Sequence, residues 1–400
     1  MNKSLRVGLT ELQSRILAES TARWFKDPAG ITASELASKL DLPHEDVYGA
    51  VEALSDAGYG TLNRDAEFTQ LSIDTENPQN DFTHTSIKTH VFFPSRQILT
   101  EAFFNSNLPK NNLSEYVVRL HLGAHQYGLI YFDEEVLLRY LDHPEIYDVE
   151  DSLAGGSITA RAEASDERFI YVRYGKCRLK SGRIAVSAIH KDLAHMGAAE
   201  QRFWHAHEIQ NPLLDTTDHN FQTFLSRTYE GAWVSYPDPI GGLLEEVAAI
   251  NAIFSPHQLF TRLANIHLRM PVEQTYKSYC DCASELYKVV GPDALSQSTI
   301  KILLQERFGL TAESLIHKDS QRPLSSLQLL GLLESKLAMT DAFTGPLKVV
   351  AKLRIDADHK ILSPDSEIRS YSKSFADLCN DLTKGISVIR EALASKSNAT

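Results

Sequence analysis

The spacing of apolar residues changes twice along the chain, and this change limits the folds that the chain can adopt. Residues 9–54 carry apolar stripes at helical spacing, residues 116–210 mostly alternate between apolar and polar, and helical spacing returns beyond 213. Stripes predict helices that each bury one face, whereas alternation predicts strands with one face in a core. A chain of 400 residues also exceeds what one hydrophobic core usually organises. The sequence therefore predicts an α+β multidomain protein.

Changes in composition divide the chain into four expected segments. They are a first domain at 1–75, a polar connector with one docked helix at 76–112, a central α+β domain at 113–212 and a helical domain at 213–400. In the central domain the alternation predicts strands near 116–122, 127–132, 155–162, 168–179 and 183–190. Helices are expected near 133–142 and 198–209 of that domain.

The first domain combines three amphipathic helices with an alternating segment. A helix is expected over 9–27, a second begins with a capping box formed by Thr32 and Glu35, and a third follows Pro43. Residues 60–73 then alternate like a two-stranded wing with its tip at residues 63–65. This order resembles the winged helix-turn-helix family, and the resemblance implies that the third helix is a recognition element.

The charge of that third helix argues against DNA reading. Residues 41–60 contain no lysine or arginine but five carboxylates: Asp41, Glu45, Asp46, Glu52 and Asp56. A helix in the major groove approaches phosphates on both sides, so these carboxylates would be repelled. We therefore expect the domain mainly to contact a protein partner, and Arg64 in the wing is a candidate contact to a nucleic-acid backbone. A conventional DNA-binding transcriptional repressor with a sensing domain stays an alternative.

The central domain contains a strongly basic stretch at 168–191, without any acidic residue. A turn at 180–182 predicts a hairpin, with Lys176, Arg178 and Lys180 on one face of its first strand. The candidate nucleic-acid contacts of this hairpin, to DNA or RNA, are Arg173, Lys176, Arg178, Lys180 and Arg183. The alternative is internal pairing, because residues 132–151 hold eight carboxylates against one arginine.

The helical domain carries a short motif in which four residues separate Arg354 from His359. It is similar to the Arg-x4-6-His motif of the higher eukaryote and prokaryote nucleotide-binding (HEPN) helical domains. The resemblance implies a homodimer in which the motifs of two protomers converge to cleave RNA without a metal. It assigns His359 as general acid or base and Arg354 as the group that stabilises the phosphate.

Several function classes have no support in the sequence. The four cysteines are scattered, and the Cys280–Cys282 pair has one intervening residue and no second pair, so neither a disulfide framework nor a metal site is expected. No cofactor motif occurs. Charged residues interrupt every long apolar run, and the first residues lack a signal peptide, so we expect a cytoplasmic protein without membrane contact. A net charge of −12 argues against indiscriminate coating of nucleic acid.

These observations together predict a non-enzymatic regulatory or adaptor protein in a nucleic-acid-associated complex. In that interpretation the winged helix contacts a protein partner and the basic hairpin contacts nucleic acid. The alternative from the Arg354 and His359 motif is a HEPN-like, metal-independent ribonuclease, which is the enzyme class to expect if the protein is an enzyme.

Overall fold

The protein is described from a computed structural model, and the residues described are 8–72, 83–106, 113–233, 237–263, 268–317, 321–359 and 370–397. It is a mixed α/β structure with two antiparallel sheets and a helical C-terminal region. The chain divides into two compact units that each combine several segments. The first unit comprises Met1–Ile130, Ala162–Val172 and Ala188–Glu208, and the second comprises Tyr131–Arg161, Arg173–Ser187 and Ile209–Thr400.

The first unit begins with three short helices around a small core. They are α1 (Glu11–Lys26), α2 (Ala33–Leu40) and α3 (His44–Asp56). Thr10 and Gln13 form a capping box at the start of α1, and the Thr32 hydroxyl accepts a hydrogen bond from the backbone of Glu35 at 3.0 Å. The apolar stripes of the three helices meet in one cluster that includes Ile16, Leu17, Leu36, Val47, Val51 and Leu54.

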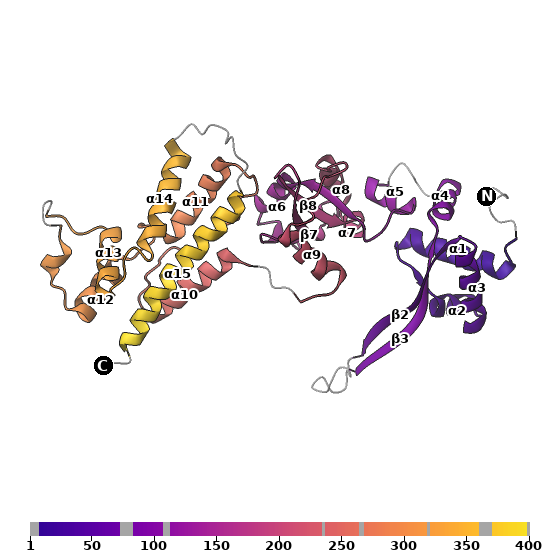
Figure 1. Ribbon diagram of the computed structural model, residues 1–400, viewed down its shortest axis with the longest axis horizontal. Coiled ribbons are helices and arrows are strands. Elements are labelled where there is room, and N and C mark those ends of the chain that lie inside the picture. Colours follow the sequence, from indigo (N-terminus) through magenta and orange to yellow (C-terminus); the bar gives the residue numbers. More distant parts are fainter. Residues whose placement is uncertain are drawn as a thin grey trace. The chain divides into compact units, whose positions relative to one another are not determined.

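A three-stranded sheet completes this part of the first unit. It contains β1 (Ile31–Thr32), β2 (Gly60–Ser72) and β3 (Thr83–Pro94) in the order β1-β3-β2. The expected wing with its tip at 63–65 is wrong, because β2 is one strand with a register shift between Asn63 and Ala66. The expected tip lacks the glycine that tight hairpin turns favour. The partner strand β3 instead lies within the expected connector, and β2 and β3 form the long ribbon seen in Figure 1.

Further helices in the described residues of the first unit are α4 (Arg96–Asn105), α5 (Glu115–His121), η3 (Asp166–Arg168), α7 (His190–His195) and α8 (Ala198–Ala206). The docked helix expected in the connector corresponds to α4. The strand expected at 116–122 is wrong, because α5 occupies this segment. Tyr116 and Leu120, four residues apart, are both buried on one face of α5. The indole nitrogen of Trp24 donates to the carbonyl of Leu120 at 2.8 Å, which ties α1 to α5.

The second sheet has the strand order β4-β8-β7-β6-β5. Its strands are β4 (Leu129–Asp133), β5 (Tyr147–Asp151), β6 (Gly155–Ala160), β7 (Tyr171–Arg178) and β8 (Ile184–Ile189). Between β4 and β5 lie η2 (Glu134–Leu137) and α6 (Leu138–Leu141). The predicted turn at 180–182 is confirmed, since Gly182 has a φ of 85° and donates to the carbonyl of Leu179 at 2.8 Å.

Both faces of β7 are covered near its C-terminal end. Tyr174 to Cys177 are all buried, so the alternation of exposed and buried residues stops at Arg173. On one face, Phe224 from α9 (His219–Tyr229) packs so closely that a Cβ at Gly175 would lie 2.4 Å from its ring. This double coverage determines where the basic residues of β7 lie.

The C-terminal region consists of helices packed around one apolar core. After α9 they are α10 (Pro239–Ile253), α11 (Tyr276–Val290), α12 (Gln297–Phe308), η4 (Ala312–Leu315), α13 (Ser326–Lys336), α14 (Thr344–His359) and α15 (Tyr371–Ser397). Helix α10 lies along α15, and α11 lies along α14 (Figure 1). Their core extends from Leu243 to Leu393 in sequence, as the helical spacing beyond 213 predicts.

Candidate functional site

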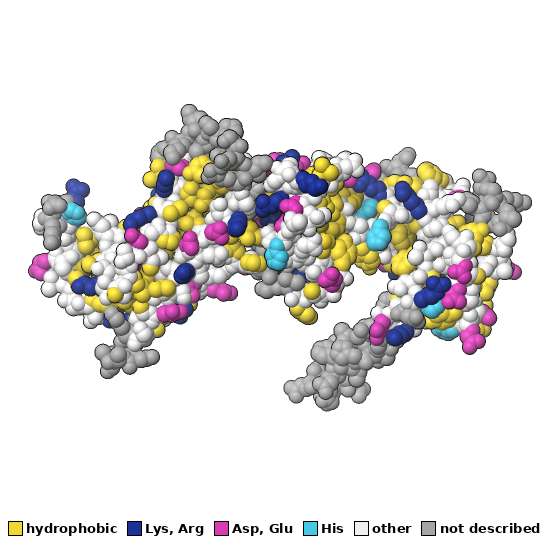
Figure 2. Space-filling model, viewed as in Figure 1, with side chains coloured by type: hydrophobic (Ala, Val, Ile, Leu, Met, Phe, Trp, Pro, Cys, Tyr) yellow, Lys and Arg dark blue, Asp and Glu magenta, His cyan; other side chains and the backbone are white. Residues whose placement is uncertain are grey.

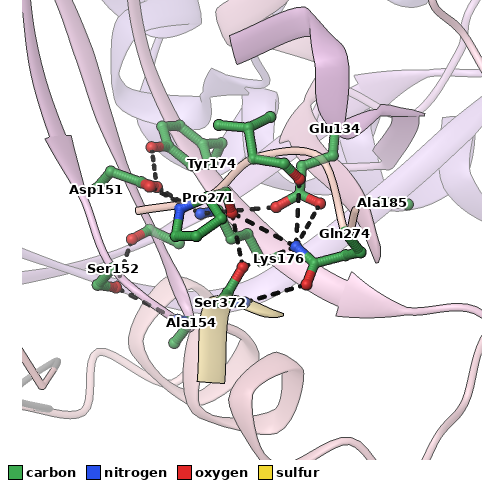
Figure 3. A network of polar contacts seen from close by, with 12 residues as sticks. Glu134, Asp151, Ser152, Ala154, Tyr174, Lys176, Ala185, Pro271, Gln274 and Ser372 are labelled. Atoms are coloured by element: carbon green, nitrogen blue, oxygen red, sulfur yellow. Dashed lines mark hydrogen bonds and ion pairs between the residues drawn. The ribbon is translucent and has the colours of Figure 1, made fainter. Parts of the chain in front are cut away.

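A buried polar network surrounds the side chain of Lys176 in the second unit (Figure 3). Lys176 is 4% exposed, and its ammonium lies 2.8 Å from the carboxylate of Asp151 at the end of β5. The same ammonium lies 3.9 Å from Oε1 of Glu134 in η2. Tyr174 is two residues before Lys176 and so shares its strand face, and its hydroxyl donates to Asp151 at 2.6 Å. One cation therefore faces two buried carboxylates.

Glu134 is the less well satisfied of these two carboxylates. Its side chain is 8% exposed, and among the described residues its Oε1 has no hydrogen-bond partner. Burial raises the pKa of Glu134 to about 8, and the Asp151 carboxylate adds to the effect while the Lys176 ammonium opposes it. Glu134 therefore holds a proton near neutral pH, which leaves one cation and one anion in the network.

Gln274 connects this network to the start of α15. Its side-chain nitrogen donates to Glu134 Oε2 at 3.3 Å and to the Ser372 hydroxyl at 2.7 Å. Its side-chain oxygen accepts from the backbone nitrogen of Ser372 at 3.2 Å. The Ser372 hydroxyl in turn donates to the carbonyl of Pro271 at 2.7 Å. The network thus joins three elements next to the sheet: η2, the segment 271–274 and the first turn of α15.

The burial of the network favours a structural role over catalysis. Glu134, Tyr174, Lys176 and Ser372 are all buried, and a substrate cannot reach them without movement of the chain. A buried ion pair contributes little net stability, but losing one partner leaves an uncompensated charge. The network can therefore hold the sheet and the C-terminal helices together and can hold a proton.

The candidate nucleic-acid residues of the hairpin differ in exposure: Lys176 is buried, and most of the others lie on the surface. Lys176 points into the buried network because β7 is covered on both faces, so its ammonium is not on the surface. Arg183 is 64% exposed and pairs with Asp133. At Lys176 and Arg183 the structure therefore shows ion pairs within the protein, which was the alternative to nucleic-acid contact. Arg173 and Lys180 are exposed and Arg178 is half-buried.

The exposed face of α3 is acidic in the structure as in the sequence. Glu45, Asp46 and Asp56 are exposed, and Glu52 is half-buried. Figure 2 shows acidic side chains gathered over the part of the first unit that holds α2 and α3. Arg64 in β2 is drawn toward this face, with ion-pair distances of 3.6 Å to Glu52 and 3.7 Å to Asp56. We name Glu45, Asp46, Glu52 and Asp56 the acidic α3 face.

The residues of the HEPN-like motif lie near the end of α14. The guanidinium of Arg354 lies 4.6 Å from the ring centre of Tyr287 on α11, a cation–π contact. Asp356 lies between the two motif residues, is buried and accepts from the Tyr276 hydroxyl at 2.7 Å. His359 ends α14, and its side chain lies outside the described residues.

The residues that the structure describes do not form a metal site. Among them, no group of three or more His, Cys, Asp or Glu side chains is arranged to hold a metal ion. Cys280 and Cys282 are buried free thiols on α11. Among the described helices, none combines the length and the apolar composition that crossing a lipid bilayer requires.

The sequence did not indicate the role of Gln274 or Ser372. Both are single polar residues without a motif, and hydrogen bonds join them to groups 98 or more residues away. In the sequence, Glu134 stood out only as one of the eight carboxylates in residues 132–151. Its position two residues after Phe132, the buried residue of β4, is a signal in the sequence, because a carboxylate beside a buried aromatic residue is a candidate for burial.

Comparisons with known protein families, with curated proteins and with solved structures give no match to this chain.

Proposed function

We propose that this protein is a non-enzymatic adaptor in a nucleic-acid-associated complex and that a winged helix at its N-terminus contacts a protein partner. The observation that carries the proposal is the acidic α3 face. The structure describes three of its four carboxylates as exposed and the fourth as half-buried. Such a face suits a basic protein surface, where complementary charge steers association and discriminates against other partners.

The order of elements in residues 8–94 supports the winged-helix assignment. Helices α2 and α3 follow one another through a turn at residues 41–43, as in a helix-turn-helix pair. The ribbon of β2 and β3 follows α3, and β1 between α1 and α2 adds the third strand. The ribbon would then be the wing.

Electrostatics favours a protein partner over DNA for this domain. Duplex DNA carries one negative charge per about 1.7 Å of its axis, so a groove-bound α3 would bring several carboxylates close to phosphates. Arg64, the candidate backbone contact, lies within ion-pair distance of two of these carboxylates. These two carboxylates compete with a phosphate for the Arg64 guanidinium, while Glu45 and Asp46 keep the helix acidic.

Nucleic-acid contact is proposed for the basic hairpin, on fewer residues than the sequence indicated. Arg173 and Lys180 are exposed, and Arg183 is exposed although paired with Asp133. Cations at a hairpin can follow a phosphate backbone without reading bases. Such contact would bring the adaptor near nucleic acid, and the acidic α3 face would select the protein partner.

The test compares two triple variants of the full chain with equal loss of charge. One neutralises α3 with Glu45→Gln, Asp46→Asn and Glu52→Gln. The control neutralises three exposed carboxylates elsewhere in the first unit with Glu163→Gln, Asp166→Asn and Glu167→Gln. Each protein is used to capture partners from extract of the native host, with and without nuclease, followed by quantitative mass spectrometry.

The proposal expects a basic partner that survives nuclease treatment, is retained by the control and is lost from the α3 variant. Far-UV circular dichroism checks that both variants keep their helices, since neutral residues in the first turn of α3 cost only about 0.3–1 kcal/mol. Equal capture by the two variants would contradict the role of α3. A nanomolar footprint of the wild-type protein on one DNA sequence would replace the adaptor by a sequence-specific repressor.

A further inference from the structure

The network around Lys176 contains more negative than positive charge when every carboxyl is ionised. Its ammonium is closer to Asp151, at 2.8 Å, than to Glu134, at 3.9 Å. Gln274 donates to one oxygen of Glu134, and the other oxygen has no hydrogen-bond partner among the described residues. Ionised Glu134 would therefore be a buried anion with only part of a counter-charge, which is unfavourable.

Protonation of Glu134 removes this imbalance. Lys176 and Asp151 then form one neutral pair, and the protonated carboxyl keeps an oxygen that can accept from Gln274. The same Gln274 side chain holds the Ser372 hydroxyl and backbone nitrogen at the start of α15. The charge state of one side chain thus bears directly on the contact between the sheet and the C-terminal helices.

We propose that Glu134 is a proton-operated latch. Protonated, it holds the segment 271–274 and the first turn of α15 in place next to the sheet, and ionisation loosens them. This regulatory device is independent of the adaptor function proposed above, since it needs neither the acidic α3 face nor the hairpin surface.

The direction of the pH dependence follows from the two states of the latch. Burial raises the pKa of Glu134 from its usual 4.5 to about 8 in the closed state. The closed state therefore binds the proton more tightly, and opening releases it. Between those values the opening constant rises by up to about tenfold per pH unit, and above about pH 8 it stays level. The latch is closed most firmly in acid and loosens toward neutral pH.

The other titratable groups around Glu134 come from four parts of the chain: β5, β7, the segment 271–274 and α15. Asp151 on β5 and Lys176 on β7 form the ion pair, and Tyr174 on β7 donates to Asp151. Burial raises the pKa of Tyr174 well above its usual range, so its phenol stays protonated throughout this window. Segment 271–274 contributes the neutral amide of Gln274 and the exposed Glu273, and α15 contributes Ser372 and the exposed Lys373.

The test is hydrogen exchange of the full chain at about pH 5.5 and about pH 7.5, with rates corrected for the intrinsic pH dependence of exchange. It compares the wild type with Glu134→Gln, which keeps the shape of the side chain but cannot ionise. The matched control is Glu150→Gln, the same change at an exposed residue on β5. The peptides of interest cover 271–274 and 371–376.

In the wild type and in Glu150→Gln, we expect protection of these peptides to fall at least tenfold between the two pH values. In Glu134→Gln the protection should be the same at both. An equal loss of protection in Glu134→Gln would overturn the proposal, as would constant protection in the wild type. The wild-type comparison alone decides the matter if Glu134→Gln fails to fold.

Discussion

Replacing Lys176 with methionine should destabilise the second unit more than any surface substitution. Methionine keeps most of the volume of the aliphatic chain and removes the ammonium, so packing changes little. The Asp151 side chain is 7% exposed, and it would lose the cation that lies 2.8 Å from its carboxylate. Removing one partner of a buried ion pair costs about 3–5 kcal/mol. That is a large part of the roughly 5–15 kcal/mol by which folded domains are stable.

Urea unfolding of the full chain, followed by far-UV circular dichroism, measures this effect. The matched control is Lys180→Met, which removes an exposed ammonium from the same hairpin and should change the stability by no more than about 0.5 kcal/mol. Adding Asp151→Asn to Lys176→Met should recover part of the loss, because one unpaired charge disappears. A loss below about 1 kcal/mol in Lys176→Met, the scale of a surface pair, would refute the buried-pair interpretation.

Three further expectations concern the hairpin, the sheet and the motif on α14. Alanine at the exposed hairpin cations should lower the salt dependence of nucleic-acid affinity by about 0.9 per lost phosphate contact, and an unchanged slope in fluorescence anisotropy would leave only internal pairing. The substituted residues are Arg173, Lys180 and Arg183. Gly155→Ala should cost at least about 2 kcal/mol, since Gly155 has a φ of 144° and the added Cβ would lie 2.1 Å from the carbonyl oxygen of Tyr174; a melting temperature within about 1 °C of wild type would contradict this. The wild-type protein in chelator should leave RNA intact, and cleavage that disappears in both Arg354→Ala and His359→Ala would replace the adaptor by a HEPN-like ribonuclease.

The sequence predicted elements whose signals are local. Helix α2 and the turn at 180–182 appear where Thr32 and Gly182 indicate them, because caps and turns depend on a few neighbouring residues. The apolar stripes beyond 213 likewise predict the helical C-terminal region, since helical spacing repeated over many turns fits no other structure.

Two predictions from the sequence were wrong. In one, a short segment fits both strand and helix spacing; in the other, a strand pairs with a strand outside the expected domain. Seven residues at 115–121 fit both alternation and a helix, and burial of Tyr116 and Leu120 decides for α5. The tip expected at 63–65 depended on pairing within one segment, whereas β2 pairs with β3 from the next segment.

Lys176 shows how far the candidate site could be predicted from the sequence. Alternation places it correctly on one face of β7 with Arg178. Whether that face meets solvent or a carboxylate depends on elements that fold against it, among them η2 and β5. Local sequence cannot indicate such coverage, and for the same reason the role of Gln274 was not predicted.

The network around Lys176 also bears on the order in which the chain can acquire its native structure. Gln274 bonds to Glu134 across 140 residues of sequence and to Ser372 across 98. Contacts of such high sequence separation form slowly, because the intervening loops must close before the contacts stabilise them. During synthesis from the N-terminus, Lys176 and Asp151 leave the ribosome long before Ser372 does. Until α15 is made, the Glu134 end of the network therefore lacks the contacts that Gln274 makes with Ser372.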